Sequence, residues 1–275
     1  MKRRTFIASA AAAAAARPAL AQQAEVKVAL ITPLSGAWAR SGDLARKGAE
    51  LAVDDINRAG GIKALGGAKM RLIVADQIYT PPLSDAAPIA QKIRAARPDF
   101  LLFLPTAAPD IKLIMEKLSE VGLGGKRLPV ISNGAPIGSP DLLKLAGKDI
   151  MEGTMFIIAN WGSRGLEDLT KRFKERTGEP WITQDSISNY GHMWLLKEAM
   201  EQSGSSERRK VNEALHAMDL TEGPGARTFP GGHVKFDQNG RRVGAPLVIV
   251  QWQNGEPVTV YPPEAAFSKP VWPKQ

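Results

Sequence analysis

Short apolar runs alternate with helix-length amphipathic segments along most of the chain, and this alternation limits the possible folds more than any other feature. The first run, VKVALI at 26–31, is rich in β-branched residues, as is typical of a buried strand. The segment 43–59 then repeats apolar residues three and four apart and ends at Gly60-Gly61, which predicts a helix. With the next run, MRLIVA at 70–75, it forms a strand–helix–strand unit that predicts a parallel α/β sheet.

The same alternation continues after residue 79 and changes character in the last third of the chain. Further helices are expected at 85–97, 109–121, 166–177, 190–202 and 207–218. Further strands are expected at 100–104, 128–132, 233–237, 247–252 and 258–261. Asn239-Gly240 and Asn254-Gly255 predict tight turns between the last strands.

The N-terminal segment, residues 1–21, has the three parts of an export signal. It has a basic start, an apolar run at 6–16 and small residues before Gln22, which predicts cleavage at that point. The apolar run is too short to span a bilayer. Arg3-Arg4 fits the twin-arginine export motif, and a general secretory signal fits equally well. Either route predicts a protein that works outside the cytoplasm.

The remaining composition argues for a binding protein over an enzyme. The chain has no cysteine and three histidines without a partner at metal-ligand spacing, and it shows no phosphate-binding loop or nucleophile elbow. No cofactor and no metal is expected. Four of the 36 basic residues and none of the 28 acidic ones lie in residues 1–21, so the rest carries a formal charge of +4. That charge is spread along the sequence, so no nucleic-acid partner is expected.

A ligand site is expected where strands pass into helices. In open α/β sheets, ligands lie beyond the carboxyl ends of the strands. The loop after the first strand contains Ser35 and Trp38, with small residues that permit close approach of a ligand. Packing of Trp38 within its own loop is an equally open interpretation.

Three stretches of the sequence resemble one known family. They are ALITPLSGAWARSG to MRLIVAD, then PDFLLFLPTAAPDIKLIMEKLSEVGL to DIMEG, and finally SNYGHMWLLKEAM to TVYPP. These are similar to the periplasmic leucine/isoleucine/valine-binding proteins, the type I extracytoplasmic solute receptors of ABC importers. The resemblance covers nearly the whole chain after the signal.

The resemblance implies an α/β fold of two lobes with parallel sheets, with a solute bound between them. It places lobe one at 24–77 and about 183–225, and lobe two at 78–182 and about 226–275. The sequence departs from the family at about Gln77, where on the order of a hundred residues of the family pattern are absent. Lobe one is therefore expected to be incomplete, with exposed strand edges.

The resemblance also implies a set of ligand-binding positions. Besides Ser35 and Trp38, these are Ser41, Thr106, Asn133, Ala135 and Tyr190. Ser41 stands where related receptors have an aromatic residue, and Ala135 has no charge where they have an acidic partner for the ligand ammonium. Tyr190 matches an aromatic residue at the cleft and is the strongest single candidate. Small amides and organic acids thereby become as plausible as ordinary α-amino acids.

Together these observations predict a monomeric periplasmic solute-binding receptor without enzymatic activity. Its expected partners are a small-molecule solute and the membrane subunits of an ABC permease. Two alternatives remain open: a sensor module for a membrane signalling protein, and a truncated remnant that binds nothing.

Overall fold

The structure, a computed structural model, describes residues 25–31, 51, 53–54, 56–62, 66–74, 82–105, 107–124, 127–205 and 207–272. Its main body is a seven-stranded sheet in the order β2-β1-β3-β4-β5-β8-β9. The strands are β1 (Glu25–Ile31), β2 (Lys69–Val74), β3 (Phe100–Phe103), β4 (Val130–Asn133), β5 (Met155–Ile158), β8 (Val248–Gln253) and β9 (Glu256–Tyr261). The first five in the order are parallel, and β8 and β9 pair antiparallel at one side. The expected α/β class with a largely parallel sheet is confirmed.

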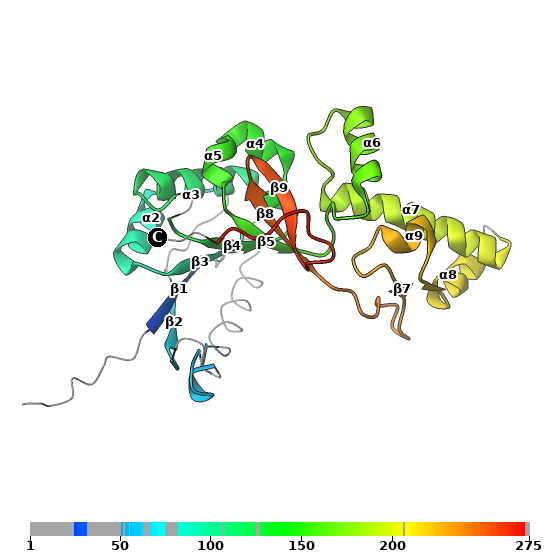
Figure 1. Cartoon of the computed structure of the whole chain (residues 1–275), viewed down its shortest axis with the longest axis horizontal. Coiled ribbons are helices and arrows are strands. Elements are labelled where there is room, and N and C mark those ends of the chain that lie inside the picture. Colours follow the sequence, from blue (N-terminus) through cyan, green and yellow to red (C-terminus); the bar gives the residue numbers. More distant parts are fainter. Residues whose placement is uncertain are drawn as a thin grey trace, which may run out of the picture.

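Helices cover one face of this sheet. They are α2 (Ala87–Ala96), α3 (Ala108–Glu120), α4 (Pro140–Ala146) and α5 (Lys148–Met151), which lie along one side of the strands in Figure 1. The apolar periodicity of the sequence explains this arrangement, because Ile89 and Ile93 of α2 and Ile111 and Ile114 of α3 are all buried. With Phe103 of β3 they belong to one continuous core.

The first two strands join the same sheet as the later ones. β1 pairs with β3 from Val28–Phe100 to Ile31–Phe103, although about 70 residues separate these strands in the sequence. The order β2-β1-β3-β4-β5 is one of the common doubly wound arrangements. Exposed strand edges were expected in the segment 24–77: β1 is paired on both sides, whereas β2 is the end strand of the described sheet. The lobe boundaries themselves remain a prediction.

The helix predicted at 43–59 lies mostly outside the described residues, but 51, 53–54 and 56–58 are helical. Asn57 attaches this helix to β2, because its amide accepts a hydrogen bond from the Met70 amide and donates one to the Met70 carbonyl. The helix ends at Gly60, whose φ of +99° favours glycine, as the sequence predicts.

A second, smaller body follows β5. It contains α6 (Glu167–Thr177), α7 (Gln184–Ser203), α8 (Arg208–His216), β6 (Asp219–Leu220), α9 (Gly223–Arg227) and β7 (Val234–Lys235). Its apolar cores are separate from that of the sheet, one around Leu195 and Val234 and one around Ile182 and Ile187. The two bodies stand side by side in Figure 1.

Most predicted elements are present with small shifts at their ends. The largest shift is in α7, which begins at Gln184 and not at Tyr190. The polar residues Thr183 and Asp185 occupy the N-cap and first turn, where such residues favour helix initiation although they interrupt the apolar pattern. The turn at Asn254-Gly255 is confirmed, with φ of +56° and +84° at the two residues between β8 and β9.

Candidate functional site

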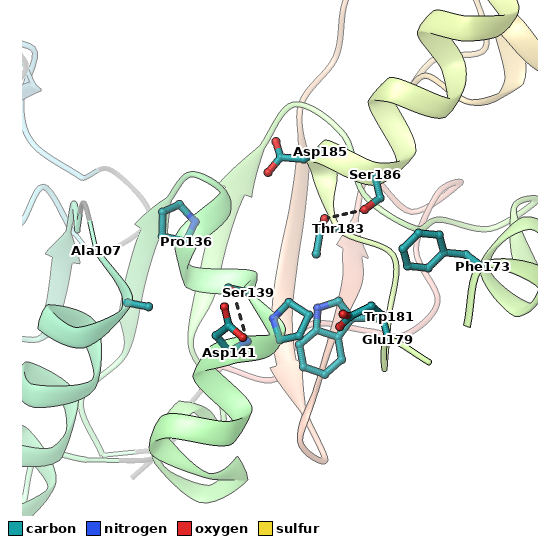
Figure 2. Close-up of a pocket in the computed structure, with 12 residues that line it drawn as sticks. Ala107, Pro136, Ser139, Asp141, Phe173, Glu179, Trp181, Thr183, Asp185 and Ser186 are labelled. Atoms are coloured by element: carbon teal, nitrogen blue, oxygen red, sulfur yellow. Dashed lines mark hydrogen bonds between the residues drawn. The ribbon is translucent and has the colours of Figure 1, made fainter. Parts of the chain in front are cut away.

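A cavity of about 500 Å³ lies where the strands β3 and β4 pass into α3 and α4. Its opposite wall is formed by α6, by the chain that leads to α7 and by the first turn of α7 (Figure 2). The lining residues are Ala107, Ala108, Pro136, Ser139, Pro140, Asp141, Phe173, Glu179, Trp181, Thr183, Asp185 and Ser186. The cavity thus lies at the carboxyl edge of the parallel sheet, where ligands of open α/β folds bind.

An indole forms part of the cavity wall. Trp181 is buried, and its Nε1 donates a hydrogen bond to the Gly138 carbonyl at 2.8 Å. Its ring meets that of Trp252 of β8 edge to face, with 5.4 Å between the ring centroids. Since the chain around Trp181 links α6 to α7, these contacts join the smaller body to the sheet at the site.

The short 3-10 helix η3 (Ala135–Gly138) holds the neighbouring wall in place. It follows β4 through Gly134, whose φ is +83°. Gly138 has no room for a side chain, since a Cβ there would lie 2.5 Å from Trp161 and 2.7 Å from Phe156. Pro136 and Ser139, which flank Ile137 and Gly138, both line the cavity. Ser139 also caps α4 by accepting a hydrogen bond from the Asp141 amide at 3.2 Å.

The first turns of α7 are held against the end of β5. The Ala159 amide donates to Oε1 of Gln184 at 3.1 Å, and Nδ2 of Asn160 donates to Oγ of Ser188 at 3.3 Å. The hydroxyls of Thr183 and Ser186 lie 3.2 Å apart and bond to each other (Figure 2). This part of the cavity wall is therefore fixed by side-chain contacts.

The cavity combines two kinds of polar feature. Its charged lining residues, Asp141, Glu179 and Asp185, are all acidic. The helices α3 and α7 begin at the cavity, and helix N-termini carry unpaired amides with partial positive charge. A small molecule that carries both an ammonium and a carboxylate group would find a complementary partner for each, with Trp181 and Phe173 available to its apolar part.

The predicted ligand-binding residues differ in where they lie relative to the cavity and in whether the structure describes them. Ser35, Trp38, Ser41 and Thr106 lie outside the described residues. Asn133 ends β4 and is exposed, without lining the cavity. Ala135 is the first residue of η3, next to the cavity residue Pro136. For all six of these residues, direct contact with a solute remains a prediction.

Tyr190 lies on α7, one turn beyond the cavity residue Ser186. It is half-buried and packs against the cluster of Leu169, Ile182 and Ile187. Hydrogen bonding to Tyr190, followed by the hydrogen bond to Asp168, raises the pKa of Arg172. Tyr190 is not among the residues that line the cavity, so its role in binding also remains a prediction.

None of the twelve residues that line the cavity is among the seven predicted ligand-binding positions, and those twelve include Asp141, Glu179, Trp181 and Asp185. Two of these four carried a usable signal, since Ser139-Pro140-Asp141 and Thr183-Gln184-Asp185 are typical helix starts. Helix starts next to strand ends are the expected position of a ligand site. Glu179 and Trp181 lie in a loop whose path only the fold defines.

Two further classes of site were searched in the described part of the chain. It contains no group of three or more His, Cys, Asp or Glu side chains able to hold a metal ion. Within the same residues, no helix combines the length and apolar character needed to cross a bilayer.

Comparison with known proteins identifies the family. The periplasmic binding protein family matches residues 25–84 and 64–257. The Leu/Ile/Val-binding protein homolog 7 of Brucella suis is 27% identical over 203 residues, 72% of this chain and 49% of the relative. The chain thus spans about half the length of this curated relative.

Solved structures show the same fold. A putative branched-chain amino acid ABC transporter protein from Silicibacter pomeroyi matches with a TM-score of 0.64 and 17% identity, over 90% of this chain and 61% of that one. A solute-binding protein from R. palustris in complex with benzoate matches with a TM-score of 0.59 and 13% identity, over 92% and 62%. The family match extends over more than half of the sequence and agrees with the sheet and the cavity described above; the chain belongs to the periplasmic binding protein family.

Proposed function

We propose that this protein binds a small amino-acid-like solute in the cavity between η3 and α7 and serves as the solute receptor of an ABC importer. The observation that carries the proposal is the cavity itself, at the carboxyl edge of the sheet in a member of this family. Its volume of about 500 Å³ lies within the range usual for small-molecule sites.

The lining chemistry supports a solute with an ammonium group. Ala135 supplies no charge, but Asp185 and Glu179 bring carboxylates to the cavity from other elements. The names of the Brucella relatives point to leucine, isoleucine and valine as the first solutes to test. Amides and aromatic acids belong in the same test, the latter because a related fold binds benzoate.

The site does not depend on a second parallel sheet. The cavity walls come from the strand ends of the main sheet, from α6 and α7, and from the loop that carries Trp181. A chain that spans only about half of the curated relative it matches can therefore still present a defined solute site. This supports a binding function over the alternative of an inactive remnant.

The partner and the compartment follow from the same proposal. A receptor of this family acts in the periplasm, consistent with the signal predicted at residues 1–21, by the twin-arginine or the general route. Permease and ATPase genes beside this gene would support transport. A neighbouring sensor kinase gene would support the alternative of a signalling module.

Thermal melting with a solute panel tests the proposal. A solute present at about 100 times its Kd adds about 2.7 kcal/mol to the free energy of unfolding, so its Tm shift is readily measured. In Ser186→Phe, a ring replaces a small side chain of the cavity, and the shift should disappear. Gln202→Phe places the same ring on an exposed part of the same helix and should leave the shift unchanged. If no solute shifts the Tm, or if both variants respond alike, the cavity is not the solute site.

A further inference from the structure

The charged side chains of the solute cavity all have the same sign. Asp141, Glu179 and Asp185 line it, and no lysine, arginine or histidine is found among the described residues of its wall. The other lining residues are neutral and include the aromatic rings of Phe173 and Trp181. The wall therefore carries an excess of negative charge, which a solute of zero net charge cannot neutralise.

The protein itself offsets little of this charge. Within the described part of the chain, the carboxylates of Glu179 and Asp185 form neither an ion pair nor a hydrogen bond. Asp141 lies 3.9 Å from Nζ of Lys144 on the same helix, but the two side chains are 71% and 72% exposed, so water screens this pair. Glu179 and Asp185 thus remain available to a cation of the solute.

The helix starts at the cavity do not reverse the sign. Helix N-termini carry partial positive charge, but α3, α4 and α7 each have an aspartate in the first turn. These residues are Asp110, Asp141 and Asp185. The wall therefore favours the cations of a solute more strongly than it favours a carboxylate.

The carboxylates of the wall lie at two separate places. Asp185 belongs to the first turn of α7, Asp141 to the first turn of α4, and Glu179 to the loop before Trp181. In Figure 2, Asp185 lies at the top of the view, and Asp141 and Glu179 are both lower. A solute with a cationic group at each end of an apolar chain can reach one carboxylate at each place. The aromatic rings also favour a cation in this cavity.

We propose that the solute of this cavity carries two cationic groups joined by an aliphatic chain, as a basic amino acid or an aliphatic diamine does. The proposal rests on the proposed function, because it assigns the chemical class of the solute at the same site. It departs from leucine, isoleucine and valine, the solutes in the name of the Brucella suis relative.

Isothermal titration calorimetry of the full chain tests the proposal with four probes: lysine, 1,5-diaminopentane, norleucine and leucine. Norleucine is the matched control, because it has the carbon chain of lysine without the terminal ammonium. Lysine or the diamine should bind at least about tenfold more tightly than norleucine, and added salt should weaken that binding. The diamine is lysine without its carboxylate, so the tighter of the two shows whether the site also recognises a carboxylate.

Two variants locate the cationic groups. Asp185→Asn and Glu179→Gln each remove one charge and keep the size of the side chain. Each should weaken binding of the tighter cationic probe about two- to fivefold, with a smaller effect on norleucine. Glu175→Gln, at an exposed position of α6 that does not line the cavity, should change neither affinity.

The outcomes separate this proposal from the proposed function. If leucine or norleucine binds as tightly as both cationic probes, this proposal is overturned, and the solute-binding function stands. If a cationic probe binds but both variants leave its affinity unchanged, the proposal is overturned as well. If none of the four probes binds, this solute class is excluded, and the wider thermal-melting panel decides on the proposed function.

Discussion

The indole nitrogen of Trp252 donates a hydrogen bond to the main-chain carbonyl of Ile137, 2.9 Å away. This bond links β8, close to the C-terminal end of the sheet, to η3 beside the cavity. Both residues are fully buried, so no water can replace the bond. The position of one cavity wall thus depends on a strand that lies 115 residues later in the sequence.

Trp252→Phe should destabilise the protein. Phenylalanine keeps most of the aromatic packing but leaves the buried Ile137 carbonyl without its donor, which costs about 1–3 kcal/mol. Urea unfolding followed by circular dichroism measures this change. Trp272→Phe is the matched control, since Trp272 is exposed and its replacement should have almost no effect. Equal midpoints for both variants would show that the bond contributes little.

Gly138→Ala should also lower stability, for a steric reason. A methyl group at Gly138 would lie 2.5 Å from Trp161 and 2.7 Å from Phe156, two rings that are themselves packed edge to face. Overpacking of this kind typically costs about 1–3 kcal/mol. At Gly162 the nearest atom would lie at an ordinary 3.4 Å, so Gly162→Ala serves as the control. If thermal melting shows Gly138→Ala to be no less stable than Gly162→Ala, the rings have room to shift.

Local periodicity was sufficient to predict most of the individual elements. The apolar run at 26–31 became β1, and the residues of 109–121 that repeat three and four apart became the buried face of α3. Two elements of four residues, α5 and β5, were not predicted, although β3 and β4 have the same length and were.

The pairing of β1 with β3 was beyond the reach of the sequence. A run such as VKVALI indicates a buried strand but does not identify its neighbours, and the family resemblance placed β1 and β3 in different lobes. The cavity was predictable in its general position at the strand ends. Its aromatic wall was not, because Trp181 reaches the site through contacts with residues distant in sequence, Gly138 and Trp252.

Asp219 should make stability depend on pH in the acidic range. Its carboxylate accepts hydrogen bonds from Lys235 and His233, and these bonds, that from Lys235 first, lower the pKa of Asp219. The carboxyl group of an unfolded aspartate has a pKa of about 3.9. Because the pKa of Asp219 is lower in the folded protein, the stabilisation is fully present above the unfolded pKa. It is lost as the pH falls through the folded pKa.

The comparison of wild type with Asp219→Asn over a pH series tests this expectation. The difference in Tm between the two should be largest near neutral pH and should shrink below about pH 4. Asp149→Asn, at an exposed position at the start of α5, should show no such change. A difference that stays constant down to the lowest pH would contradict the assignment.

Tyr190→Ala should reduce stability, since the half-buried ring packs against Leu169, Ile182 and Ile187. Loss of a partly buried aromatic ring is expected to cost about 2–3 kcal/mol. Tyr190→Phe keeps the ring and removes only the hydroxyl, so it is the variant with which to measure solute affinity. A Tyr190→Phe protein with unchanged Tm and weaker binding would support the predicted solute contact. Unchanged binding would leave Tyr190 with a packing role alone.

The position of β2 at the outer edge of the sheet has a consequence for how chains of this kind can vary in length. Because β3 pairs with β1 on the side away from β2, no strand of the described residues lies beyond β2. A gain or loss of sequence after β2 is therefore compatible with an unchanged scaffold, and insertion of an independently folding domain after Val74 is the change this architecture should tolerate best.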